Sequence, residues 1–169
     1  MDLGIVTLPQ TANNIEVIPL FRDEVQVVVP KKHPLAKNKR VTVEEMTHYP
    51  LVIPKTGRTR VMLDRLLRDH RDHVQISMEL ASVETIKKFV GAGLGISIIS
   101  RTYAQPEVAA GVLKLIPLEG LKLYRELGLI YRRDRYLSLP ARIFIEVVRK
   151  TALAPKSGPP TDTHTTNSR

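Results

Sequence analysis

The chain has 169 residues, 43% of them hydrophobic and 25% charged, which is typical of a soluble globular protein with one domain or two small lobes. It contains no cysteine, which excludes disulfides, a cysteine-ligated metal and a thiol nucleophile, and no apolar run approaches the roughly 18 residues of a membrane span. The formal net charge of +9 indicates a polyanionic partner only if the basic residues form one continuous surface.

The start of the chain has neither the basic n-region nor the long apolar segment of a signal peptide, so we expect a cytoplasmic protein. Residues 2–6 predict a short strand that ends in a polar turn at Thr7. A strand so close to the start suggests one piece of a larger sheet. Residues 15–21 and 23–30 are rich in β-branched side chains and predict two further strands.

Residues 31–40 are polar, and we expect them to form a surface loop. The basic residues of this segment, with no acid between them, are Lys31, Lys32, Lys37, Lys39 and Arg40. Two more basic groups lie at residues 55–71 and 132–135, in separate segments. Because aromatic residues make up only 5% of the chain and Trp is absent, stacking on single-stranded bases is poorly supported. Direct nucleic-acid binding through the first basic group remains an alternative.

Thr42 followed by Glu45 forms a capping box, which predicts a short helix that ends before Pro50. The run at residues 50–54, between two prolines, predicts a buried strand. The next helix follows the turn at residues 55–60. Its apolar stripe, at i, i+3 and i+4, consists of Leu63, Leu66 and Leu67.

Residues 74–80 alternate with period two and predict a strand. Ser82 is a good N-cap for the helix that follows. The apolar stripe of that helix consists of Val83, Ile86 and Val90. The glycine-rich residues 91–95 end this helix and lead directly into a strand at residues 96–99.

Residues 111–118 and 125–132 predict two more strands, and Ser138 caps a last helix. Residues 155–169 contain no large apolar side chain, so we expect a disordered tail. The alternation of strands and helices predicts an α/β fold with a largely parallel sheet. In such sheets, ligands bind at the carboxyl ends of the strands, next to helix N-termini.

The turn at residues 55–60, KTGRTR, has one glycine and therefore lacks the spacing of a phosphate-binding P-loop. It does offer the N–H groups at a helix start, two threonine hydroxyls and Arg58, which together suit an anion. The alternative is that Thr56 and Thr59 only cap the helix. Ser82 lies in a similar position, and there the cap is the favoured interpretation.

An enzymatic function is not indicated. His70 and His73 flank Asp72 on a helix end and suggest a metal site, but solvated helix-end charge is the favoured interpretation. The sequence contains no G-x-S-x-G motif and no paired carboxylates. We therefore expect neither catalysis nor a cofactor.

Five segments in this order carry a family resemblance: DLGIVTLP, IPLFRDEVQVVVPKKHPLA, VIPKTGRTRVMLD, ASVETIKKFVGAGLGISIIS and GVLKLIPL. Together they resemble the effector-binding domain of LysR-type transcriptional regulators over residues 2–151. The TGRT turn is especially similar to members that regulate sulfur assimilation and carbon fixation. Ser100 stands where the family usually has proline, which we interpret as a minor capping difference.

The resemblance implies a type 2 periplasmic-binding-protein-like fold, with two Rossmann-like α/β lobes joined by crossover strands. Lobe I would comprise residues 1–20 and 118–154, and lobe II residues 21–117. The small-molecule effector would lie in the cleft between them. The residues implied to contact it are Thr7, Leu8, Thr56, Gly57 and Arg58, with Ser82 as a weaker member of the set.

The resemblance does not include the family's winged helix-turn-helix, its linker helix or the first elements of lobe I. We therefore expect a C-terminal portion of a regulator with an incomplete lobe I, which folds poorly alone or borrows a partner. The full-length regulator would be a dimer or tetramer that contacts DNA only through the absent domain. The competing hypothesis is a solute-binding protein of a transport system with the same fold.

Overall fold

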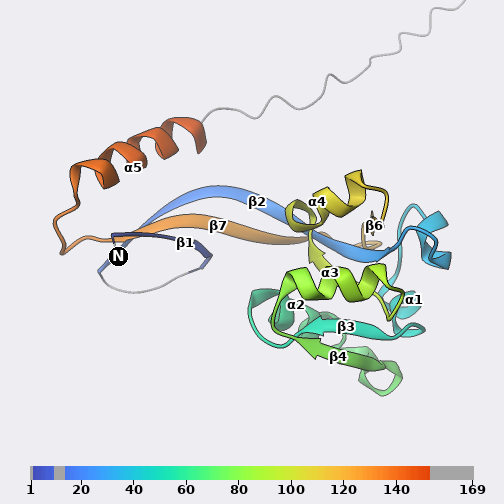
Figure 1. Ribbon diagram of the computed structural model, residues 1–169. Coiled ribbons are helices and arrows are strands. Elements are labelled where there is room, and N and C mark those ends of the chain that lie inside the picture. Colours follow the sequence, from blue (N-terminus) through green and yellow to red (C-terminus); the bar gives the residue numbers. More distant parts are fainter. Residues whose placement is uncertain (1, 10–13, 153–169) are drawn as a thin grey trace, which may run out of the picture.

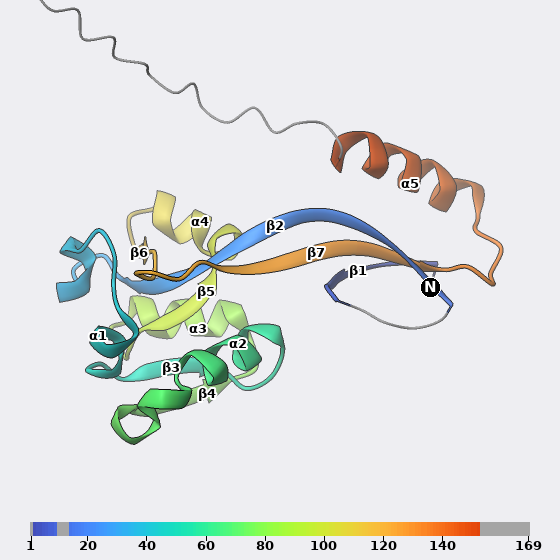
Figure 2. The same cartoon turned by 180° about the vertical axis from the view of Figure 1, so that it is seen from behind.

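The computed structural model describes residues 2–9 and 14–152, which form two parts of unequal size joined by two long strands (Figures 1 and 2). The strands are β1 (Leu3–Thr7), β2 (Ile15–Pro30), β3 (Leu51–Pro54), β4 (Ile76–Leu80), β5 (Ser97–Ser100), β6 (Leu113–Ile116) and β7 (Leu123–Arg132). The helices are α1 (Val43–Thr47), α2 (Arg58–Leu66), α3 (Val83–Gly91), α4 (Arg101–Ala109) and α5 (Leu139–Ala152), with 3-10 turns η1 (Pro34–Lys37) and η2 (Arg68–His73). The tail expected at residues 155–169 lies outside the described residues.

The larger part holds α1 to α4, β3 to β6 and one end of β2 and β7, whereas the smaller part holds β1, α5 and the other end (Figure 1). The sequence predicted two strands over residues 15–30, and this prediction is wrong: β2 is one strand of 16 residues. Its pairing with β7 shifts register between Pro19 and Phe21. Because proline has no N–H for the ladder, the strand bulges there instead of ending.

The largely parallel sheet predicted from the sequence is found only in part. β3 and β4 pair in parallel, and a parallel bridge between Leu51 and Ile96 links β3 to the residue before β5. The pairs in the larger sheet, whose order is β1-β7-β2-β5 with β6 also on β2, are antiparallel. The long strands explain this, because β2 carries the chain into the larger part and β7 carries it back.

Three helix starts follow the sequence predictions. Thr42 and Glu45 form the expected capping box, and Ser82 and Ser138 accept hydrogen bonds from N–H groups three residues further on. Helix α4 was not predicted, because its mixed composition gives no apolar stripe and Pro106 lies inside it. The surface loop expected at residues 31–40 was wrong in part, since η1 buries an apolar side chain within it.

The core lies mainly in the larger part, on both faces of its sheet. On one face, side chains of β2 and β5 pack with Met46 of α1 and Leu63 of α2; on the other, Val28 packs with Ile86 of α3 and Ala104 of α4. Alternation along β2 sends successive valines to opposite faces, so both helix layers are anchored on one strand. The buried cluster of the smaller part consists of Ile18, Leu129 and Ile145. Among the described residues, no helix has the length and apolar content needed to cross a membrane.

Candidate functional site

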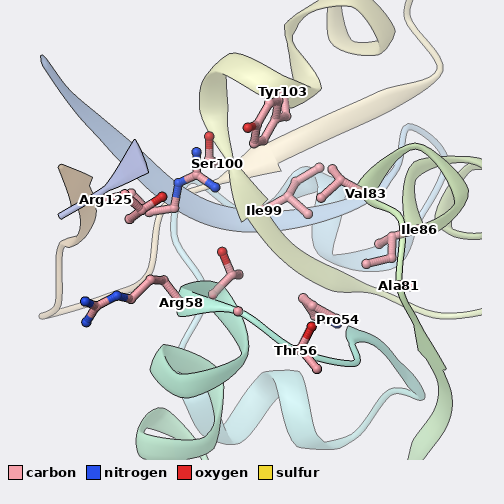
Figure 3. Close-up of a pocket in the computed structure, with 13 residues that line it drawn as sticks. Pro54, Thr56, Arg58, Ala81, Val83, Ile86, Ile99, Ser100, Tyr103 and Arg125 are labelled. Atoms are coloured by element: carbon pink, nitrogen blue, oxygen red, sulfur yellow. The ribbon is translucent and has the colours of Figure 1, made fainter. Parts of the chain in front are cut away.

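A cavity of about 220 Å³ lies where the smaller part meets the larger one (Figure 3). It collects residues from the ends of β1, β3 and β5, from the starts of α2, α3 and α4, and from near the start of β7. The residues that line it are Thr7, Pro54, Thr56, Gly57, Arg58, Thr59, Ala81, Val83, Ile86, Ile99, Ser100, Tyr103 and Arg125. The cavity therefore occupies the edge at which strands of the larger part end and their helices begin, as the α/β prediction required.

Helices α2, α3 and α4 all direct their N-termini toward this cavity, and a helix N-terminus carries about half a positive charge. The start of α3 is capped by Ser82, whose hydroxyl accepts from the N–H of Thr85 at 3.5 Å. The start of α4 is capped by Asp23, whose carboxylate accepts from the N–H of Thr102 at 3.2 Å. Helix α2 begins after Gly57 and has no side-chain cap. No side chain bonds its first N–H groups, whereas α3 and α4 each have one such N–H engaged, so the start of α2 leaves the most donors to a ligand.

The two threonines of the turn do not cap α2, which answers the alternative left open by the sequence. The N-cap position is occupied by Gly57, whose φ of 97° lies in the left-handed region that favours glycine. The hydroxyls of Thr56 and Thr59 line the cavity and have no hydrogen-bond partner among the described residues. Both are thus free to bond a ligand held at the start of the helix.

Of the residues implied by the family resemblance, Thr7, Thr56, Gly57 and Arg58 line the cavity. Leu8 does not, and its side chain instead lies over Gly128 of β7, where a Cβ atom would be only 2.9 Å from a methyl group of Leu8. Ser82 also lies outside the lining, because its hydroxyl caps α3.

Arg58 lines the cavity but directs its guanidinium away from it (Figure 3). Its Nη2 donates to the carbonyl oxygen of Pro9 at 2.5 Å, which joins the start of α2 to the segment that follows β1. The side chain is exposed and links the two parts of the molecule.

Sequence reasoning missed a second group of residues on the opposite wall. The guanidinium carbon of Arg125 lies 4.9 Å from the ring centroid of Tyr103, which is a cation–π contact. Ser100, the N-cap of α4, donates its hydroxyl to the carboxylate of Asp23 rather than to the helix backbone, so it does more than replace a capping proline. Asp23 is 5% exposed and lies opposite Arg125 in the backbone register of β2 and β7. In the sequence, Asp23 lies within the charged run at residues 22–24 and Arg125 is followed by Glu126, so neither residue stands out and only their contact in the fold reveals the group.

Tyr103 is held in place by a buried lysine. Lys87, only 5% exposed, donates to the carbonyl oxygen of Tyr103 at 3.0 Å and forms ion pairs with Glu84 at 3.0 Å and Glu107 at 2.8 Å. Burial is the largest effect on the pKa of Lys87 and lowers it, but the hydrogen bonds to the two glutamates outweigh burial, and the pKa lies above its usual value. Burial likewise raises the pKa of Glu107, yet the hydrogen bond from Lys87 brings it below its usual value.

The geometry offers a binding site rather than a metal centre. Within residues 2–9 and 14–152, no group of three or more His, Cys, Asp or Glu side chains is placed to hold a metal ion. His70, Asp72 and His73 belong to η2, where Asp72 and His73 are exposed and His70 is partly exposed. The cavity combines an uncapped helix start, free hydroxyls and an arginine, which suits a small anion.

Comparisons with known proteins agree with this geometry. The family model described as "LysR substrate binding domain" matches residues 1–153. The HTH-type transcriptional activator CmpR of Synechocystis sp. (strain ATCC 27184 / PCC 6803 / Kazusa) is 30% identical over 146 residues, which cover 86% of this chain and 48% of CmpR. The HTH-type transcriptional regulator CbbR of Xanthobacter flavus is 37% identical over 144 residues, covering 83% of this chain and 43% of CbbR. The chain thus spans about half the length of the curated relatives it matches.

Two solved structures share the fold. The regulatory domain of CcmR from Synechocystis PCC6803, in complex with 2-PG, superposes with a TM-score of 0.79 at 22% identity, over 91% of this chain and 74% of that one. The effector-binding domain of QuiR, in complex with shikimate, gives a TM-score of 0.75 at 23% identity, over 89% of this chain and 71% of that one. These likenesses confirm the type 2 periplasmic-binding-protein-like fold that the sequence resemblance implied.

Proposed function

The chain belongs to the LysR substrate-binding domain family, and from this membership we propose that its cavity is the effector site of a LysR-type transcriptional regulator. The larger part would be lobe II, about residues 21–117, and the smaller part would belong to lobe I. The observation that carries the proposal is the uncapped start of α2, which opens into a cavity at the junction of the two parts. The ligand is a small metabolite that bears a carboxylate or a phosphate.

The ligand chemistry follows from the donors that face the cavity. The first N–H groups of α2 and the hydroxyls of Thr56 and Thr59 are all able to donate to an anion, and none is used by a cap. The neighbours CcmR and QuiR bind 2-PG and shikimate, which are small anionic compounds. A ligand of that size and charge matches a cavity of about 220 Å³.

The response would be a shift between lobe arrangements. Residues of both parts line the cavity, so a ligand that contacts Thr7 and α2 together binds better when the parts are held close. The contact of Arg58 with Pro9 already spans the same junction and would strengthen or break as the lobes move. The site would therefore work by binding and not by catalysis.

In the intact regulator, this shift would reach DNA through a separate DNA-binding domain. We propose that the regulator is a dimer or tetramer and acts in the cytoplasm, since its relatives are transcriptional regulators. A transport function is not favoured, because no observation at the site or among these relatives points to it.

The test is calorimetric measurement of anion binding to the wild type and to single-residue variants. Thr56→Val removes the hydroxyl and keeps the shape, and we expect it to weaken binding of 2-PG or shikimate by about tenfold, with the melting temperature unchanged. Arg58→Ala should weaken the transcriptional response of the intact regulator more than its stability, because the side chain is exposed.

The matched control is Thr151→Val on α5, whose hydroxyl bonds Val147 and lies far from the cavity. It should leave binding unchanged. The proposal fails if neither anion binds the wild-type chain, or if the Thr56 and Thr151 variants bind both anions equally well.

A further inference from the structure

We propose that Arg125, carried by β7, is the residue that pairs with the anionic group of the effector, using the edge formed by its two Nη groups. This inference rests on the proposed function and names the residue that would select the ligand. The matching chemical group is one with two neighbouring anionic oxygens, as in a carboxylate or a phosphate.

The first observation is an unused donor. Arg125 lines the cavity, and its Nε is buried without a hydrogen-bond partner among the described residues. Buried polar groups nearly always have a partner, so a guanidinium beside an open cavity with no acceptor among the described residues points to a ligand that supplies one at the Nη groups. No carboxylate of the described residues lies within ion-pair distance of this guanidinium.

The acid directly across the sheet is Asp23, and it is already engaged. Its carboxylate accepts from the hydroxyl of Ser100 and from the N–H of Thr102, so it serves the start of α4. The carboxylate of Asp23 therefore offsets the partial positive charge at the start of α4, and the N–H groups of Arg125 remain available to a ligand in the cavity.

The second observation is the support beneath the guanidinium. The ring centroid of Tyr103 lies 4.9 Å from the guanidinium carbon, and this cation–π contact leaves the N–H groups of Arg125 available to an acceptor. The backbone of Tyr103 is fixed in turn by buried Lys87. The arginine is thus held in place before a ligand arrives, which reduces the entropy lost on binding.

The two arginines of the cavity consequently differ in role. Arg58 is exposed and bonded to the carbonyl oxygen of Pro9 across the junction, whereas Arg125 is partly buried and its Nε is unbonded. Figure 3 shows the same contrast, with Arg125 beside Ser100 and Arg58 extending away. Arg125 would bind the ligand, and Arg58 would join the lobes.

The experiment is calorimetric titration of the full chain with 2-PG, shikimate and inorganic phosphate, in wild type and in two variants. Arg125→Met removes the charge, and Arg125→Lys keeps the charge but removes the two-donor edge. We expect the methionine variant to weaken anion binding by about ten- to a hundredfold, and the lysine variant to recover only part of that loss. Comparing shikimate with phosphate identifies which of the two anionic groups the edge prefers.

Arg22 is the matched control, because it lies on the neighbouring strand with a side chain 70% exposed and paired with Glu126. Arg22→Met and Arg22→Lys should bind as the wild type does. Tyr103→Leu should weaken binding and Tyr103→Phe should retain most of it, since the ring is what supports the guanidinium. These two variants also keep the inference testable if Arg125→Met does not fold.

The outcomes separate this inference from the proposed function. If Thr56→Val weakens binding while Arg125→Met does not, the cavity is the effector site but Arg125 is not its anion partner. If Arg125→Lys binds as tightly as the wild type, the cavity recognises charge alone, and the proposed contact through two N–H donors is wrong. If the wild-type chain binds none of the three anions, both the proposed function and this inference are overturned.

Discussion

At the scale of single residues, the distribution of helix caps decides where a ligand can bind. The three helices that face the cavity differ in how their starts are capped. Ser82 caps α3, Asp23 of β2 caps α4, and Gly57 leaves α2 without a side-chain cap. The sequence predicted the cap at Ser82 and singled out the turn before α2. It could not reveal that Asp23 serves α4, because that contact joins residues 79 positions apart in the chain.

Glu107 gives a prediction about pH at this scale. Its pKa lies below the ordinary value of 4.5, so its ionised form stabilises the fold above that pH, and the contribution is lost as the pH falls through the lowered pKa. We expect Glu107→Gln to lower the free energy of unfolding by about 1–2 kcal/mol at neutral pH, since Lys87 keeps Glu84 as a partner. The variant should also lose stability less steeply than the wild type below about pH 4.5.

Urea denaturation at a series of pH values measures both effects, with Glu146→Gln on exposed α5 as the control for the change in charge. The contribution of Lys87 to stability changes with pH in the opposite direction. Because its pKa is raised, the contribution is complete below the ordinary value of 10.5 and is lost as the pH rises through the raised pKa. Parallel pH profiles for wild type and Glu107→Gln in acid would show that the Lys87–Glu107 pair does not stabilise the fold.

At the scale of elements, the short helices and strands of the larger part were predictable, and their pairing was not. Local signals such as the Thr42 capping box act within a few residues, so they can be read directly. The direction of a strand depends on its partner, and β7 meets β2 only after about a hundred intervening residues. Helix α4 escaped prediction for a related reason: with little amphipathic pattern of its own, it depends on contacts with β2 and β6.

The turn between α3 and β5 offers a comparison of two glycines. Gly93 has a φ of +80°, and no atom lies within 4 Å of the place that a Cβ would take, whereas Gly95 has a φ of +149° and would place a Cβ 2.5 Å from the carbonyl oxygen of Pro50. That oxygen accepts the N–H of Ile96 at 2.9 Å and so links β3 to β5. We expect Gly93→Ala to cost about 1 kcal/mol and Gly95→Ala about 3 kcal/mol or more.

Chemical denaturation of the two variants measures these costs directly. Both glycines have positive φ, but the φ of Gly95 lies further from any conformation that alanine adopts, so the difference measures the close approach of the backbone together with this added strain. Equal destabilisation would mean that the contact with Pro50 relaxes without cost and that the junction of β3 and β5 is not tightly packed.

At the scale of the whole molecule, the cavity lies where two parts meet along β2 and β7, and these parts have cores of different size. The larger part has buried side chains on both faces of its sheet, whereas α5 in the smaller part leaves Ile143, Phe144 and Val147 about half exposed. The family resemblance predicted a cleft at this junction and four of the residues that line it. The opposite wall, with Arg125 and Tyr103, appears only when α4 and β7 are brought together by the fold.

The central claim is that a small anion binds at the start of α2, and backbone NMR of the chain during titration with 2-PG tests it most directly. The largest shift changes should fall on the amides of Gly57, Arg58 and Thr59, saturating with one binding constant. Changes confined to the basic segment at residues 31–40, fading as salt is added, would contradict the claim, because they would indicate nonspecific attraction of the anion to surface charge.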